Sequence, residues 1–154
     1  MAAGVQLSDL NWLGLALAVV ANFVIGFVWY APWFPTGKIW MKGMGMSPDH
    51  KPDTKAMIRG MLIMVVGAFL TMFVFAHNFI AYKLMYQYAP GGSTSYKLTA
   101  SDGLMAGVFT WLGFFLPTSL GGVAWEGKKW SYGFVQAGYH LVSMLVAGLL
   151  IALV

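Results

Sequence analysis

The sequence predicts an all-α membrane protein with four transmembrane helices arranged as two hairpins. Hydrophobic residues make up 59% of its 154 residues and charged residues only 9%, whereas a soluble domain has about 25% charged residues. Because so few charges cannot cover a soluble globule of this size, we expect the apolar surface to face lipid. Four apolar stretches are also long enough to cross a bilayer core, which requires roughly 20 residues per helix.

The four predicted spans form a single transmembrane domain over residues 1–154. They cover residues 10–31, 57–82, 102–124 and 132–154. The first connection is long and contains prolines, lysines and aspartates. The second is a turn-rich loop around Pro90-Gly91-Gly92, and the third, WEGKKWS, is short enough to force a tight hairpin.

The distribution of lysine and arginine predicts the orientation. The first and third connections, with the start of the second span, carry Lys38, Lys42, Lys51, Lys55, Arg59, Lys128 and Lys129. Only Lys83 and Lys97 lie on the other side. Since cytoplasmic loops carry the excess of Lys and Arg, we expect these two connections in the cytoplasm and both termini outside.

Similar residues occur at both ends of the first and third spans. The first span starts with SDL at Ser8 and is followed by GKIW at Gly37, and the third starts with SDGL at Ser101 and is followed by GKKW at Gly127. Ser and Asp side chains can cap a helix start. Either a weak internal repeat relates the two hairpins, or similar boundary chemistry arose twice.

The segment GKIWMKGMG, residues 37–45, has two interpretations. It is a short interfacial helix whose apolar side chains lie on lipid while Lys38 and Lys42 reach the headgroups, or it is a connecting loop with the same lysines.

Polar residues interrupt the fourth span at regular spacing. Gln136, Tyr139, His140 and Ser143 are three or four residues apart and form one stripe on a helix. His140 lies roughly 12 Å along the helix from Tyr132, near the middle of the membrane. A polar group that faces lipid is costly, so we expect the stripe to face other helices or a cavity.

Potential partners lie at similar depth, including the carbonyl that Pro117 leaves without a donor. We predict a polar cluster made of Asn22, Thr118, Ser119, Gln136, Tyr139, His140 and Ser143. The cluster either joins helices by hydrogen bonds or binds a ligand, a lipid headgroup or an ion. Gly14, Ala18 and Gly26, spaced by four or eight residues, predict a helix-packing face on the first span.

The sequence shows no catalytic, cofactor or metal site. All five carboxylates, Asp9, Asp49, Asp53, Asp102 and Glu126, lie at span ends or in loops, and there are no cysteines. His50 is the only histidine near acidic residues, and a charged loop favours its solvation. His77 and His140 differ in height by roughly 15 Å, too far apart to share one haem within a single chain. The scattered lysines mark topology and not a nucleic-acid interface.

Three segments resemble a bacterial family of small integral membrane proteins known as domain of unknown function 1761. They are Asn11-Trp12, the block GFVWYAPWFPTGKIWMKGMG from Gly26, and the ending GFFLPTSLGGVAWEGKKWSYGFVQAGYHLVSMLVAGLLIAL. The resemblance covers almost the whole chain and implies a four-helix protein of the bacterial inner membrane. It implies no activity.

We therefore expect a non-catalytic four-helix protein that self-associates, has membrane lipid as a partner, and uses its polar cluster for helix packing and for binding lipid or a small ligand. An accessory subunit of a larger membrane complex, and a small homo-oligomeric transporter or channel, are the alternatives.

Overall fold

The computed structural model describes residues 6–47, 53–93 and 95–154, and in these residues it contains helices but no strands. The elements are η1 (Leu7–Asp9), α1 (Trp12–Trp29), α2 (Pro35–Gly43), α3 (Thr54–Tyr88), α4 (Ala100–Thr110), the π-helical segment η2 (Trp111–Phe115), α5 (Leu116–Trp125) and α6 (Trp130–Leu153). Four helical spans are long and apolar enough to cross a membrane: α1, α3, the continuous run from α4 to α5, and α6. The predicted all-α class with four spans is confirmed.

The observed helices follow the predicted spans, with one clear difference at α3. This helix continues six residues beyond the predicted end at Tyr82 because Lys83 and the residues after it form helices well. It stops at Tyr88, because Ala89 precedes Pro90 and has an extended backbone with ψ of 150°. The tight hairpin between α5 and α6 turns at Gly127, whose φ is +66°.

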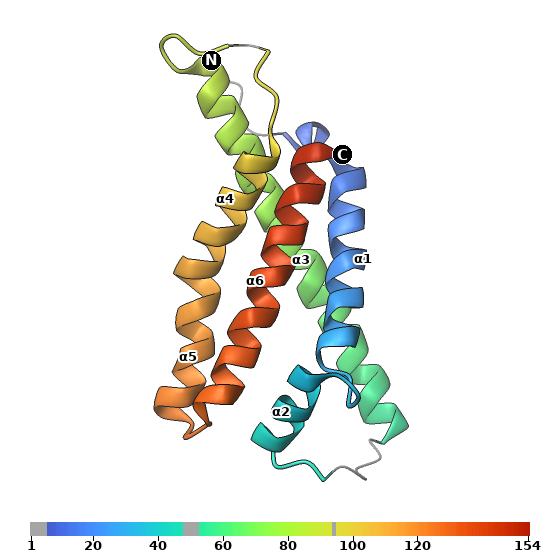
Figure 1. Ribbon diagram of the computed structural model, residues 1–154. Coiled ribbons are helices and arrows are strands. Elements are labelled where there is room, and N and C mark those ends of the chain that lie inside the picture. Colours follow the sequence, from blue (N-terminus) through green and yellow to red (C-terminus); the bar gives the residue numbers. More distant parts are fainter. Residues whose placement is uncertain (1–5, 48–52, 94) are drawn as a thin grey trace.

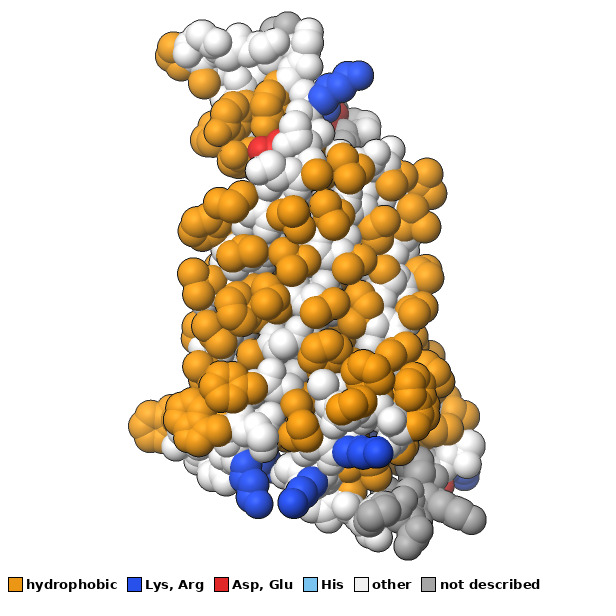
Figure 2. Space-filling view, in the orientation of Figure 1, with side chains coloured by type: hydrophobic (Ala, Val, Ile, Leu, Met, Phe, Trp, Pro, Cys, Tyr) orange, Lys and Arg blue, Asp and Glu red, His pale blue; other side chains and the backbone are white. Residues whose placement is uncertain are grey.

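Helix α6 lies at the centre of the bundle. It packs against α1 on one side and against α4 and α5 on the other, while α3 crosses the bundle at an angle (Figure 1). Apolar side chains cover the middle of the molecule, and Lys and Arg side chains gather at the lower end in Figure 2. We call this the lysine-rich end, and the other, which carries Lys83 and Lys97, the lysine-poor end.

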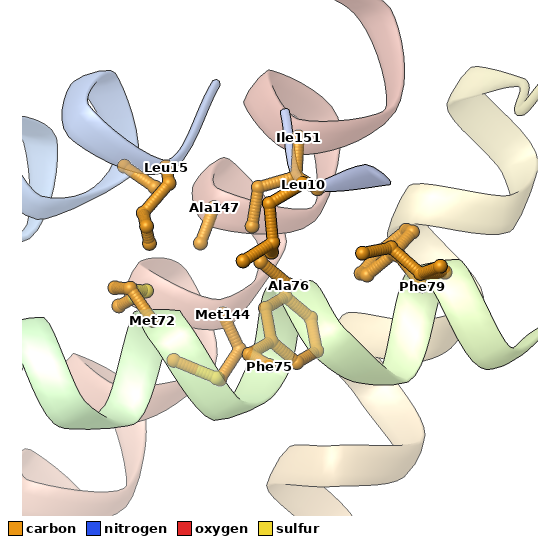
Figure 3. Packing of buried hydrophobic residues seen from close by; sticks show 11 residues of the cluster. Leu10, Leu15, Met72, Phe75, Ala76, Phe79, Met144, Ala147 and Ile151 are labelled. Carbon is orange, nitrogen blue, oxygen red and sulfur yellow. The ribbon is translucent and has the colours of Figure 1, made fainter. Parts of the chain in front are cut away.

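The hydrophobic core occupies the half of the bundle next to the lysine-poor end. Its buried side chains come from the start of α1, the second half of α3 and the second half of α6 (Figure 3). Leu15, Met72 and Met144 are the largest apolar side chains with almost no exposure. The core therefore joins three helices at this end only.

In the other half of the bundle, α3 diverges from its neighbours. Every residue from Thr54 to Gly67 is exposed. At about 1.5 Å per residue, α3 is about 52 Å long, much longer than a bilayer core of about 30 Å, so it must tilt or protrude. Helix α2 packs there against α1 and α6 instead. The interpretation of this segment as a short helix is confirmed, although the helix starts at Pro35 and ends at Gly43.

The helix starts differ in detail from the expected Ser-Asp caps. Asn11 caps α1 by accepting a hydrogen bond from the Gly14 N–H at 2.9 Å, and Thr99 caps α4. Asp9 and Asp102 instead each accept from the backbone N–H three residues earlier, at 3.1 and 2.8 Å. The two spans thus share a local carboxylate-to-backbone contact, but neither serine is the cap.

Candidate functional site

Asn22 of α1 and Tyr139 of α6 form a buried polar pair between the two helices. The Tyr139 hydroxyl donates to Asn22 Oδ1 at 2.9 Å, and the two side chains are 9% and 5% exposed. Gly26, one turn along α1, borders the tyrosine ring, and a Cβ there would make ordinary van der Waals contact with the hydroxyl at 3.4 Å. The Tyr139 hydroxyl and Asn22 Oδ1 are therefore paired directly, inside the protein.

A second polar pair lies nearer the lysine-rich end. The hydroxyl of Tyr30, the residue that follows α1, donates to Gln136 Oε1. The Tyr30 ring lies 5.2 Å from the Tyr139 ring and 5.3 Å from the ring of Trp40 in α2. Tyr30 thus connects the two polar pairs to each other and to α2.

Two tryptophans donate to the backbone of α6 from opposite sides. Trp29 Nε1 donates to the carbonyl oxygen of Val135 at 3.0 Å, and Trp111 Nε1 donates to that of Ala137 at 2.7 Å. Neither tryptophan was singled out from the sequence. The position of Trp111, nine residues into a predicted span, was the available signal, because it lies too deep for the membrane interface where tryptophan is common.

Pro117 affects the third span within its own helix. A π turn precedes it, and the Leu116 N–H donates to the carbonyl of Trp111. The Thr118 hydroxyl donates to the carbonyls of Phe114 and Phe115, at 2.8 and 3.0 Å. Thr118 is exposed, so its hydroxyl supports this irregular turn and does not reach the Asn22–Tyr139 pair.

Of the remaining predicted cluster residues, Ser143 follows Tyr139 by one turn of α6, His140 points to another side of that helix, and Ser119 belongs to α5. The His140 ring stacks on Phe115 with 4.5 Å between ring centroids and 22° between planes, and its imidazole makes no hydrogen bond in the described part of the chain. Ser143 is 2% exposed, and its hydroxyl has no hydrogen-bond partner among the described residues. Ser119 is half-buried and likewise has no bond to the Asn22–Tyr139 pair.

The predicted packing residues lie where α1 meets its neighbours. Gly14 and Ala18 are buried, and a Cβ at Gly14 would lie 3.0 Å from the Leu150 carbonyl oxygen. The closest approach that a glycine allows between two of the spans lies elsewhere, between Gly103 and Gly148. A Cβ at Gly103 would lie 2.4 Å from the Gly148 carbonyl oxygen. The sequence carried a signal for this contact, since GLMAG (residues 103–107) is a GxxxG pattern.

Metal-ligating residues do not converge within the described ranges. No group of three or more His, Asp and Glu residues there is arranged to hold a metal ion. His77 Nδ1 lies 3.0 Å from the Phe73 carbonyl oxygen of its own helix. Asp49 and His50, the acid–histidine pair of the first connection, lie outside the described residues.

Two cavities lie against the second half of α3. The first, of about 450 Å³, opens at the lysine-poor end and is lined by the end of α6, by α3, and by Asp9, Asn11 and Lys97. The second, of about 510 Å³, lies between α3 and α4. Phe79 borders both cavities. Neither is lined by a member of the predicted polar cluster.

Comparison with known proteins agrees with the resemblance in the sequence. A family model with the description "Protein of unknown function (DUF1761)" matches residues 13–152. No curated protein matches the chain, and no solved structure does. Because the family model covers most of the chain, including all four spans, the protein belongs to the DUF1761 family.

Proposed function

We propose that this protein is a non-catalytic, multi-pass protein of the bacterial inner membrane that binds membrane lipid or a small amphiphile. The observation that carries this proposal is the separation of polar cluster and cavities. Asn22 pairs with Tyr139, and Tyr30 with Gln136, so these groups are occupied in joining helices. The two cavities lie elsewhere, against α3.

The arrangement of acidic residues supports a non-catalytic role. A site for acid–base or metal chemistry brings several titratable groups to one cavity. The described carboxylates instead lie at helix ends, where Asp53 caps α3 and Asp102 accepts bonds from Thr99 and Tyr96. The Asp102 bond raises the pKa of Tyr96 above its ordinary value, because it stabilises the protonated phenol.

The test is native mass spectrometry of the protein, extracted in mild detergent from its own membrane, with the Gln136→Leu variant alongside. The proposal expects lipid or another small molecule to remain bound to both proteins. It also expects the variant to unfold more readily, because Tyr30 loses its acceptor. Protein free of any bound small molecule would contradict the proposal, as would a variant that keeps its stability and loses its ligand.

The proposed orientation places both termini outside the cytoplasm. The chain has no cysteine, so single-cysteine variants report one position each. In intact cells, a membrane-impermeant maleimide is expected to label Lys97→Cys and to leave Lys129→Cys unlabelled until the membrane is opened. The opposite pattern would invert the orientation.

A second candidate function, as a subunit of an oligomer or a larger complex, is favoured by the first half of α3. Met61, Leu62 and Ile63 are 50–62% exposed although they are consecutive and point to different sides of the helix. A helix exposed all round has room for a second copy or another membrane protein. The same mass measurement distinguishes these states, since it gives either a multiple of the chain mass or a mass that includes foreign chains.

A further inference from the structure

We propose that the cavity at the lysine-poor end is a binding site for an anionic amphiphile, with Lys83 and Lys97 holding a phosphate or carboxylate head. This inference rests on the proposed lipid-binding function and assigns it to one site. The cavity, of about 450 Å³, is bordered by α3, the end of α6 and the loop before α4. It therefore lies where the bundle meets the headgroup level of a membrane.

The bottom of this cavity is apolar. Ala76, Phe79 and Ile80 of α3 and Ile151 of α6 line it, and all four are buried in the hydrophobic core, partly shown in Figure 3. Leu98 adds a further apolar side chain from the loop. Such a surface accepts hydrocarbon and offers nothing to a small hydrophilic ion.

Some polar groups at the rim of the cavity already make hydrogen bonds within the protein, and others do not. The Asn11 side chain donates to the Ile151 carbonyl at 3.2 Å and accepts from the Gly14 N–H. Asp9 accepts from the Gln6 N–H. Lys83 and Lys97, by contrast, make no ion pair or hydrogen bond with the described residues, so two ammonium groups remain available as donors.

The charged side chains at the rim of the cavity favour a ligand with a negatively charged head. Among the side chains that line the cavity, two lysines stand against one carboxylate, Asp9; Val154, the last residue of the given sequence, also lines it. Among the described residues, no other Lys or Arg lies at this end, and the remaining described Lys and Arg residues lie at the lysine-rich end. Topology alone requires no cations here. A ligand with an anionic head and an apolar tail matches both the rim and the bottom of the cavity.

The test measures binding of defined amphiphiles to the full-length protein in neutral detergent by native mass spectrometry. The probes are phosphatidylglycerol, phosphatidylcholine, dodecyl phosphate and inorganic phosphate. We expect phosphatidylglycerol to bind more tightly than phosphatidylcholine, and inorganic phosphate not to bind in the same range. Binding of dodecyl phosphate would assign the site to anionic amphiphiles in general, and its failure beside phosphatidylglycerol would restrict it to two-chain membrane lipid.

Substitutions locate the binding. Each lysine near an anionic group contributes a factor of about 5 in affinity, so Lys83→Gln/Lys97→Gln is expected to weaken phosphatidylglycerol binding about 30-fold. Asp9→Asn, which removes the repelling charge, is expected to strengthen it. The matched control is Lys38→Gln/Lys129→Gln, which removes two exposed lysines at the other end and is expected to leave the affinity unchanged.

Ala152→Phe tests the cavity itself without a change in charge. Ala152 lines the cavity and is half-buried, so a larger side chain occupies space meant for the ligand. Binding is expected to fall while the melting temperature in ligand-free detergent stays at or above that of the wild type. Equal phosphatidylglycerol affinity in the wild type and the Lys83/Lys97 variant would overturn this site. The wider proposal of lipid binding fails only if the wild type binds none of the amphiphiles.

Discussion

The contact between α4 and α6 at Gly103 and Gly148 predicts a large effect from one added methyl group. A Cβ on Gly148 would lie 2.1 Å from the Gly103 carbonyl oxygen. Ordinary van der Waals contact begins at 3.4 Å, so Gly148→Ala forces the two backbones more than 1 Å apart. Because the obstacle is backbone and not the end of a flexible side chain, no rotamer change can relieve it.

The expected loss of stability follows from the cost of separating two helices that pack at this backbone distance. Larger side chains in a packed interior cost typically about 1–3 kcal/mol, and separation at Gly148 also loosens the neighbouring contact of Gly107 with Met144. We therefore expect Gly148→Ala to lower the free energy of unfolding by about 3 kcal/mol. Gly60→Ala is the matched control. No atom lies within 4 Å of a Cβ at Gly60, so it should be neutral or stabilising by up to about 1 kcal/mol.

The assay is reversible unfolding in mixed micelles with increasing sodium dodecyl sulfate, followed by far-ultraviolet circular dichroism. Gly113→Ala, in the same span as Gly103 but with open space around it, serves as a second control. If Gly148→Ala unfolds at the same denaturant fraction as Gly60→Ala, the close approach of α4 and α6 is wrong and so is their packing order.

Two further predictions concern the polar contacts of α6. Tyr139→Phe leaves Asn22 Oδ1 without its donor and should lower the free energy of unfolding by about 0.6–2 kcal/mol. A double-mutant cycle with Asn22→Leu in the same unfolding assay should show coupling between the two residues. Additive effects would mean that the pair does not interact. Trp111→Phe removes the bond to the Ala137 carbonyl and should destabilise by about 1 kcal/mol, whereas Trp125→Phe, at a side chain 90% exposed, should leave the midpoint unchanged. Equal midpoints for the two tryptophan variants would count against the α6 bond.

The four spans could be predicted because a helix that crosses a membrane must be apolar over its whole length. Each span needs roughly 20 apolar residues whatever its neighbours are, so length and hydrophobicity alone locate it. The close contact between α4 and α6 was also within reach, since GLMAG at residues 103–107 carries the small-residue pattern of such contacts. Its partner, Gly148, also begins a small-residue pattern with Ala152, but nothing in the sequence says that these two patterns meet, so the pairing required the structure.

The path of α3 could not be predicted, because its apolar residues are spread around the whole helix. In a soluble helix, a polar face would have shown which side is buried. Here lipid accepts every side, so the sequence does not distinguish Met61, which is exposed, from Met72, which is 1% exposed. The divergence of α3 in turn explains why α2 packs against α1 and α6 at the lysine-rich end, which was not expected either.

The polar stripe of α6 has the spacing of one helix face, but its residues contact more than one neighbouring element. Successive helical residues point about 100° apart, so Tyr139 and His140 face different elements although they are adjacent in the stripe. Tyr139 meets Asn22 of α1, while His140 stacks on Phe115 of the π-helical segment. A central helix with neighbours on both sides therefore divides a stripe that would mark one site on a peripheral helix. The sequence supplied the stripe, but only the central position of α6 decides that its residues join separate helices.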